Sequence, residues 1–124
     1  MQWALIFAGV SGAIAVGFGA WSAHGAERFL DAEALGWVKT AVTYQVWHSL
    51  ALVGTSVLMS IKPGRFLPPA AYAFAAGIVM FSGCLYLLAL TAVRLFAFPI
   101  PVGGICFIAG WLFMAIYALM VDRR

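Results

Sequence analysis

Four long apolar runs alternate with short polar links along this chain. Each run has close to the ~20 residues with which an α-helix crosses a lipid bilayer. Apolar positions are continuous within the runs, whereas the strands of a membrane barrel alternate apolar and polar residues. The pattern therefore predicts an all-α, polytopic membrane protein with four transmembrane helices. We expect the spans at residues 3–23, 40–61, 70–93 and 103–121.

The composition agrees with a chain that lies in lipid. Hydrophobic residues occupy 65% of the 124 positions and charged residues 9%. A soluble domain of this length has too little interior to hide so much apolar surface. We therefore expect one transmembrane domain over residues 1–124, a compact bundle whose surroundings are the lipid bilayer. The first run lacks a basic segment before it and a clean cleavage site after it, so we expect it to be retained as a span.

The links predict where the helices begin and end. Residues 24–39 mix charged and apolar side chains, which predicts a short amphipathic segment at the membrane surface between the first two spans. Asp31 is placed to cap a helix that continues into the second span. Pro63 and Gly64 are expected to end that span, and residues 98–101 to form a rigid link before the fourth.

The basic residues predict an orientation. With four spans, both termini lie on one side together with the link between the second and third spans. The basic residues on that side are Lys62, Arg65, Arg123 and Arg124, and those on the other side are Arg28, Lys39 and Arg94. The excess favours both termini in the cytoplasm. Tryptophans that lie at or near the predicted membrane boundaries are Trp3, Trp21, Trp37 and Trp111.

The second run is the most polar of the four, and His48 lies near its middle. An ionisable side chain at that depth normally faces other protein or a water-filled cavity. Tyr44 and Gln45 lie one helical turn before it. A polar seam, defined as Thr40, Tyr44, His48 and Thr55, is expected along this helix. Either His48 moves a proton or holds a ligand in a buried site, or it is neutral and joins helices by bonding to Tyr44, Ser82 or a backbone carbonyl.

Two further residues complete the candidate buried polar site. Ser82 shares a helix face with Tyr86 in the third run, and both are candidate partners of the seam. His24 ends the first run, where it either bonds a helix-end carbonyl or forms the lip of a binding site with the charged link. The candidate site therefore comprises His48, Tyr44, Gln45, Ser82 and His24.

Small residues in the first run form a candidate face for helix association. Gly9, Ala13 and Gly17 recur every four residues and so share one face, which permits close approach of another helix. We expect that helix to belong to this protein, with self-association as the alternative. Cys84 and Cys106 lie within apolar runs and are expected to be packing residues.

No residue set typical of catalysis, cofactor binding or metal binding is evident in the sequence. The spans contain no acidic residue that would exchange protons in a transporter. Ser49 follows His48 directly, but neighbours on a helix point about 100° apart. His24 and His48 lie at different depths, so they are not expected to share a haem. We therefore predict a protein that is not an enzyme, has no cofactor and binds no nucleic acid.

Several segments resemble the membrane protein family called domain of unknown function 423. They are GAWSAHG at 19–25, TAVTYQVWHSLAL at 40–52, FSGCLYLLALT at 81–91, PIPVGG at 99–104 and GW at 110–111. The resemblance covers nearly the whole chain and implies a small four-helix protein of the bacterial inner membrane with no established activity. It marks His24, Tyr44, Gln45, His48, Ser82 and Gly83 as motif positions. The chain departs from the family pattern at Ser22, Cys84 and Arg94.

These observations lead to two functional hypotheses. The first is a non-enzymatic membrane component that associates through small-residue helix faces, with itself or with another membrane protein. The alternative is a small oligomeric transporter or channel that uses the polar seam centred on His48.

Overall fold

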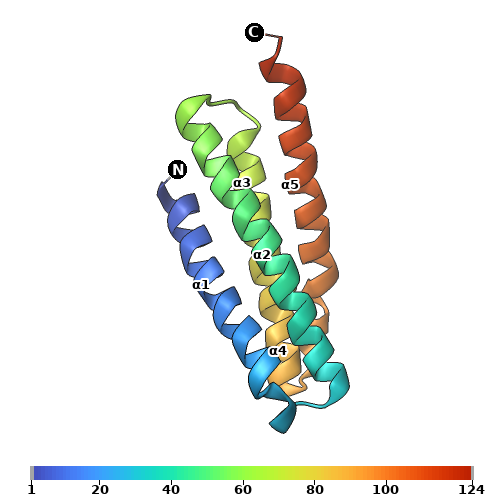
Figure 1. Ribbon diagram of the computed structural model, residues 1–124. Helices are drawn as coiled ribbons and strands as arrows, with labels where there is room; N and C mark the ends of the chain where they lie inside the picture. The colour runs from blue at the N-terminus through green and yellow to red at the C-terminus, as the bar shows by residue number, and fades with distance from the viewer. Residues whose placement is uncertain (1, 124) are drawn as a thin grey trace.

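The computed structural model describes residues 2–123, and every regular element in that range is helical. These residues form four helical rods that run alternately up and down (Figure 1). The rods are α1 at Gln2–His24, α2 at Ala32–Ile61, α3 at Leu67–Gly77 continued by α4 at Cys84–Thr91, and α5 at Pro99–Val121. The start of α1 and the end of α5 lie at the same end of the bundle as the α2–α3 link (Figure 1). The structure therefore confirms the predicted all-helical class.

Three of the rods are long and apolar enough to cross a membrane, judged by length and composition. They are Gln2–His24, Leu67–Thr91 and Arg94–Val121. With 30 residues, α2 is long enough as well, but residues such as Gln45 and His48 make it less apolar than the other three. A crossing by α2 therefore stays a prediction.

The link between α1 and α2 differs from the predicted amphipathic segment. A 3-10 turn occupies Ala26–Arg28, and α2 already begins at Ala32. The Asp31 carboxylate accepts a hydrogen bond from the backbone N of Ala34 at 2.8 Å, so the predicted cap is confirmed. The predicted amphipathic segment over residues 24–39 is not a surface segment at residues 32–39. Those residues form the first turns of α2 and bury Val38 in the core.

The sequence predicts one span over residues 70–93, but the third rod is not a continuous α-helix. A π-helical segment, Ile78–Gly83, lies between α3 and α4. The rod ends at Thr91, where Ala92 takes a left-handed backbone conformation with φ 57°. A 3-10 turn then leads into α5, which starts at Pro99 rather than near residue 103. Pro99 and Pro101 belong to the first turn of α5. Proline fits there because backbone N–H groups in a first turn have no partner within the helix.

Two apolar clusters form the core, one toward each end of the bundle. On α2 the first includes Ala34, Val38 and Ala41, and the second includes Leu52 and Met59. Three buried polar residues of α2, Gln45, His48 and Ser49, lie between the clusters, at the middle of the helix. We call them, with their partners on other helices, the polar layer, which consists of Ser11, Gln45, His48, Ser49 and Ser82.

The last rod packs mainly against the third rod rather than against α2. Glycines permit this approach: a Cβ added at Gly103 would lie 2.5 Å from the backbone N of Phe81, and one at Gly110 would lie 2.6 Å from the Phe74 ring. Because α5 follows the third rod so closely, α2 and α5 meet through long side chains.

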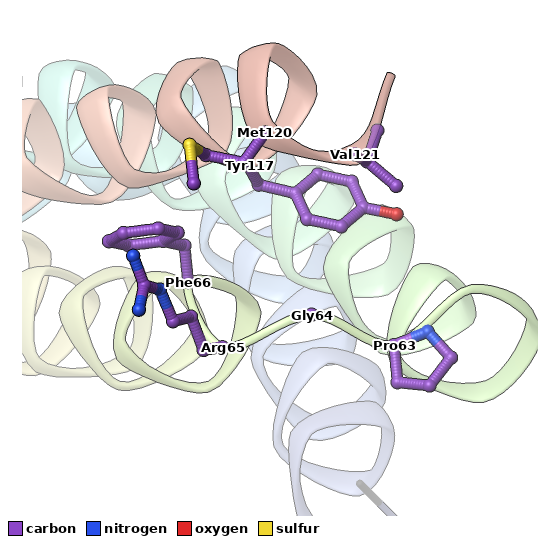
Figure 2. A pocket seen from close by; sticks show the side chains of 7 residues that line it. All are labelled: Pro63, Gly64, Arg65, Phe66, Tyr117, Met120 and Val121. Atoms are coloured by element: carbon purple, nitrogen blue, oxygen red, sulfur yellow. The ribbon is translucent and has the colours of Figure 1, made fainter. Parts of the chain in front are cut away.

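Residues near the C-terminus are tied to the α2–α3 link. Figure 2 shows Tyr117 of α5 beside the link residues Pro63 and Gly64. The Tyr117 hydroxyl donates a hydrogen bond to the Lys62 carbonyl at 2.7 Å. The cavity here has a volume of about 20 Å³, comparable to the space for one water molecule. The cavity beside this contact has no room for a larger ligand.

Candidate functional site

One face of α2 is joined to α1 and α4 by buried hydrogen bonds. The Gln45 amide nitrogen donates to the Ser11 carbonyl and to the Ser11 hydroxyl, each at 3.1 Å. The Tyr86 hydroxyl donates to the Gln45 amide oxygen at 2.6 Å. Ser49 donates to the Ser11 hydroxyl at 2.7 Å. Gln45 thus links three rods, since its amide offers both donors and an acceptor.

Ser82 makes a second link between α2 and the third rod. It lies in the π-helical segment, is fully buried, and donates to the Ala41 carbonyl at 2.8 Å. The structure therefore brings Ser82 and Tyr86 against α2, as the sequence predicts, although their partners are Ala41 and Gln45 rather than His48.

His48 faces away from these residues, toward α5. Its side chain is only 3% exposed. Trp111 donates its indole N–H to Nε2 of His48 at 3.1 Å, and Nδ1 lies 2.6 Å from the Tyr44 carbonyl oxygen. An indole nitrogen can only donate, so Nε2 accepts and Nδ1 carries the proton that it donates to Tyr44. The ring also stacks on Phe107, with centroids 3.6 Å apart.

This geometry is that of a neutral histidine which joins helices. Both ring nitrogens of His48 are used, one by its own helix and one by α5. The sequence does not indicate Trp111 as this partner: it is among the tryptophans expected at or near the membrane boundaries, although residue 111 is central in the predicted span 103–121. In the structure Trp111 lies in the middle of α5, and only tertiary contacts reveal its role.

The other seam residues do not form a continuous polar path. Thr40 is exposed, whereas Thr55 is fully buried and donates to the Ala51 carbonyl at 2.8 Å. Tyr44 is 36% exposed and packs against Phe81, with ring centroids 4.8 Å apart. The structure thus gives Gln45 partners on α1 and α4, whereas His48 bonds to α5.

Tyr44 and His48 line an open groove between α2 and α5. We call it the aromatic groove; its volume is about 610 Å³. Its lining residues are Tyr44, Trp47, His48, Leu50, Phe81, Gly104, Phe107, Ile108 and Trp111.

His24 is not part of this arrangement. It is the exposed last residue of α1, next to the turn that leads into α2. His48 lies 16 residues after the first residue of α2, a rise of about 24 Å along the helix. The structure therefore does not bring the two histidines together.

The predicted association face of α1 points outward. Gly9, Ala13 and Gly17 are exposed, and a Cβ added at either glycine would meet nothing within 4 Å. α1 instead packs against α2 through its opposite face, which carries Ala4, Ala8, Ser11 and Ala15. The expectation that the small-residue face packs within this protein is therefore wrong, because the alanines and the bonded Ser11 fill that role.

Other candidate chemistry is limited within residues 2–123. Cys84 and Cys106 are free thiols. No group of three or more His, Cys, Asp or Glu side chains in this range is placed to hold a metal ion.

Apolar helical rods around a buried polar layer define a small helical membrane protein. The chain belongs to the family described as Protein of unknown function (DUF423), whose sequence model matches residues 18–104. This finding confirms the resemblance seen in the sequence motifs.

Relatives across bacteria are membrane proteins as well. The UPF0382 inner membrane protein YgdD of Escherichia coli is 42% identical over 120 residues, which cover 97% of this chain and 92% of YgdD. A UPF0382 membrane protein of Haemophilus influenzae is 34% identical over 111 residues, 90% of this chain and 89% of its own. One of Staphylococcus saprophyticus is 38% identical over 112 residues, 90% of this chain and 92% of its own. No solved structure matches this chain significantly.

Proposed function

We propose that this protein is a non-catalytic component of the bacterial inner membrane, a single four-span domain that pairs with a second copy through the outer face of α1. The observation that carries the proposal is the outward position of Gly9, Ala13 and Gly17. The relative YgdD, named an inner membrane protein, supports the location.

The packing of α2 supports a fourth crossing. α2 runs antiparallel to α1 and to the third rod, and it lies against both along its length. If those rods cross the bilayer, a helix that connects their opposite ends crosses it too. The polar groups in its middle are removed from lipid by bonds to neighbouring rods, as a membrane interior requires. In the sequence, the basic residues on the side of the termini, Lys62, Arg65, Arg123 and Arg124, outnumber those on the other side, Arg28, Lys39 and Arg94, which favours a cytoplasmic position for both termini. Arg124 lies outside the described residues.

The small residues of α1 support association. Within a helix, a glycine lowers helix stability by about 1 kcal/mol relative to alanine. Gly9 and Gly17 do not offset this loss by close packing inside the bundle, because no atom lies within 4 Å of a Cβ added at either position. Membrane helices associate where small residues let two backbones approach closely. A second copy of α1 offers the same face, so the ridge of Gly9, Ala13 and Gly17 is self-complementary in a symmetric dimer.

The polar layer supports a non-catalytic role. Every buried side-chain nitrogen and oxygen among residues 2–123 has a hydrogen-bond partner. His48 is neutral and uses both of its ring nitrogens in hydrogen bonds, and Thr55 is fully buried. Both observations favour a role in helix packing over the alternative, a water-filled transport path along the polar seam.

Cysteine crosslinking tests the dimer. In a background with Cys84→Ser and Cys106→Ser, Ala13→Cys is expected to form a covalent dimer when membranes are mildly oxidised, because the α1 faces of two copies meet there. Ile14→Cys is the matched control, since Ile14 is exposed at the same depth but lies about 100° around the helix. Adding Ala13→Leu to an otherwise unchanged chain should convert the dimer to a monomer on sizing in mild detergent. Equal crosslinking at both positions, or none at Ala13, would reject the interface.

A further inference from the structure

We propose that the aromatic groove binds the flat, carbonyl-bearing ring of a lipid-soluble compound, of the kind found in alkyl and isoprenoid quinones. This ligand site goes beyond the proposed association and does not depend on it.

The groove has the size and place of a site for such a ring. Its volume of about 610 Å³ falls within the range of about 300–1,000 Å³ that is typical of small-molecule sites. It lies about halfway along α2 and α5, at the depth of the hydrocarbon core. Trp47 and Trp111 at its rim are each about half exposed, so a molecule dissolved in the membrane reaches it from the side.

Stacked rings form the wall of the groove. The His48 and Phe107 rings are nearly parallel, at 10° with centroids 3.6 Å apart. Tyr44 lies nearly parallel to Phe107 as well, at 15° and 6.2 Å. Offset stacking is the arrangement that aromatic faces favour, and it suits a flat conjugated ring better than a flexible acyl chain.

Two residues that line the groove carry side-chain donors that have no acceptor among residues 2–123. His48 and Trp111 satisfy each other. The Tyr44 hydroxyl and the Trp47 indole N–H make no hydrogen bond within residues 2–123, although both residues line the groove. In a hydrocarbon core without water, an unpaired donor is costly. A ring carbonyl supplies an acceptor at this depth, whereas the ester carbonyls of phospholipids lie near the membrane surface.

The backbone next to the groove departs from α-helix. Phe81 belongs to the π-helical segment Ile78–Gly83 and packs against both Tyr44 and Phe107. Short π-helical turns occur frequently at functional sites. Gly103 lets α5 lie directly against Phe81, so this part of the wall is closely packed.

Quenching of tryptophan fluorescence tests the proposal. The full chain in lipid nanodiscs is titrated with a decyl-substituted 1,4-benzoquinone, and saturable quenching is expected because Trp47 and Trp111 line the groove. Tyr44→Phe should weaken binding about tenfold, since it removes one donor and keeps the ring. Tyr72→Phe removes a hydroxyl on α3 outside the groove and should bind as the unchanged chain does.

Two variants that fill the groove test binding independently of the hydrogen bond from the Tyr44 hydroxyl. Gly104→Leu places a side chain in the groove and should abolish saturable quenching, whereas Gly54→Leu, on an open face of α2, should not. Where Gly104→Leu lowers the yield of folded protein, Ile108→Phe replaces it, because it adds bulk at the groove without adding a tryptophan. The proposal is overturned if quenching never saturates, if dodecylbenzene competes as well as the quinone, or if Tyr44→Phe and the blocking variants bind like the unchanged chain.

Discussion

Single side chains in the polar layer hold the rods in register. Gln45 makes three hydrogen bonds to two neighbouring rods, and His48 makes one to α5. Interhelical bonds of this kind each contribute only about 0.6–2 kcal/mol in a membrane. Their directions are nevertheless specific, because each donor finds its acceptor in only one arrangement of the helices. The layer therefore selects one packing among several that apolar surfaces alone would allow.

The first prediction concerns Gln45. Gln45→Met keeps the shape of the side chain and removes three hydrogen bonds, so we expect the free energy of unfolding to fall by about 2 kcal/mol. Reversible unfolding of the protein in mixed micelles measures the change. Thr43→Val is the control, because its exposed hydroxyl bonds only to the Lys39 carbonyl of the same helix. A loss no larger than that of the control would show that the layer adds no stability.

At the scale of elements, two helices use small residues in opposite ways. α5 buries Gly103 and Gly110 against the third rod, whereas α1 turns Gly9 and Gly17 outward. The two pairs look alike in the sequence. Small residues on one helix face indicate that another helix approaches closely, but they do not show which helix it is. The partner is inside the chain for α5 and, under the proposed function, a second copy for α1.

Adjacent glycines on α5 supply the second prediction. At Gly103 a Cβ would lie 2.5 Å from the Phe81 backbone nitrogen, whereas at Gly104 the nearest atom is 3.9 Å away. Gly103→Ala should therefore lower the free energy of unfolding by about 2 kcal/mol through overpacking, and Gly104→Ala should be nearly neutral or slightly stabilising. Thermal unfolding of both variants in the same detergent checks the difference. Similar melting temperatures for the two would contradict the packing of α5 on the π-helical segment.

For the whole molecule, the decisive question is whether α2 crosses the membrane. Its two ends are marked by exposed residues, Arg28 before the helix and Pro63 after it. In the background without native cysteines, Arg28→Cys should react with a membrane-impermeant maleimide added to intact cells. Pro63→Cys should react only after the cells are opened, because four spans place the α2–α3 link in the cytoplasm. Equal labelling of both positions in intact cells would mean that α2 does not cross.

The sequence by itself determined the helical membrane class, because continuous apolar runs of bilayer length are a local property. It also determined the Asp31 cap and placed Ser82 and Tyr86 among the contacts of α2. Only the tertiary structure decided which partner each polar residue has, which face of α1 packs, and where the third rod becomes π-helical. The physical reason is that lipid and protein interior are equally apolar. The packed and lipid-facing sides of a membrane helix therefore differ little in hydrophobicity. Close packing with distant segments determines which side of the helix faces protein.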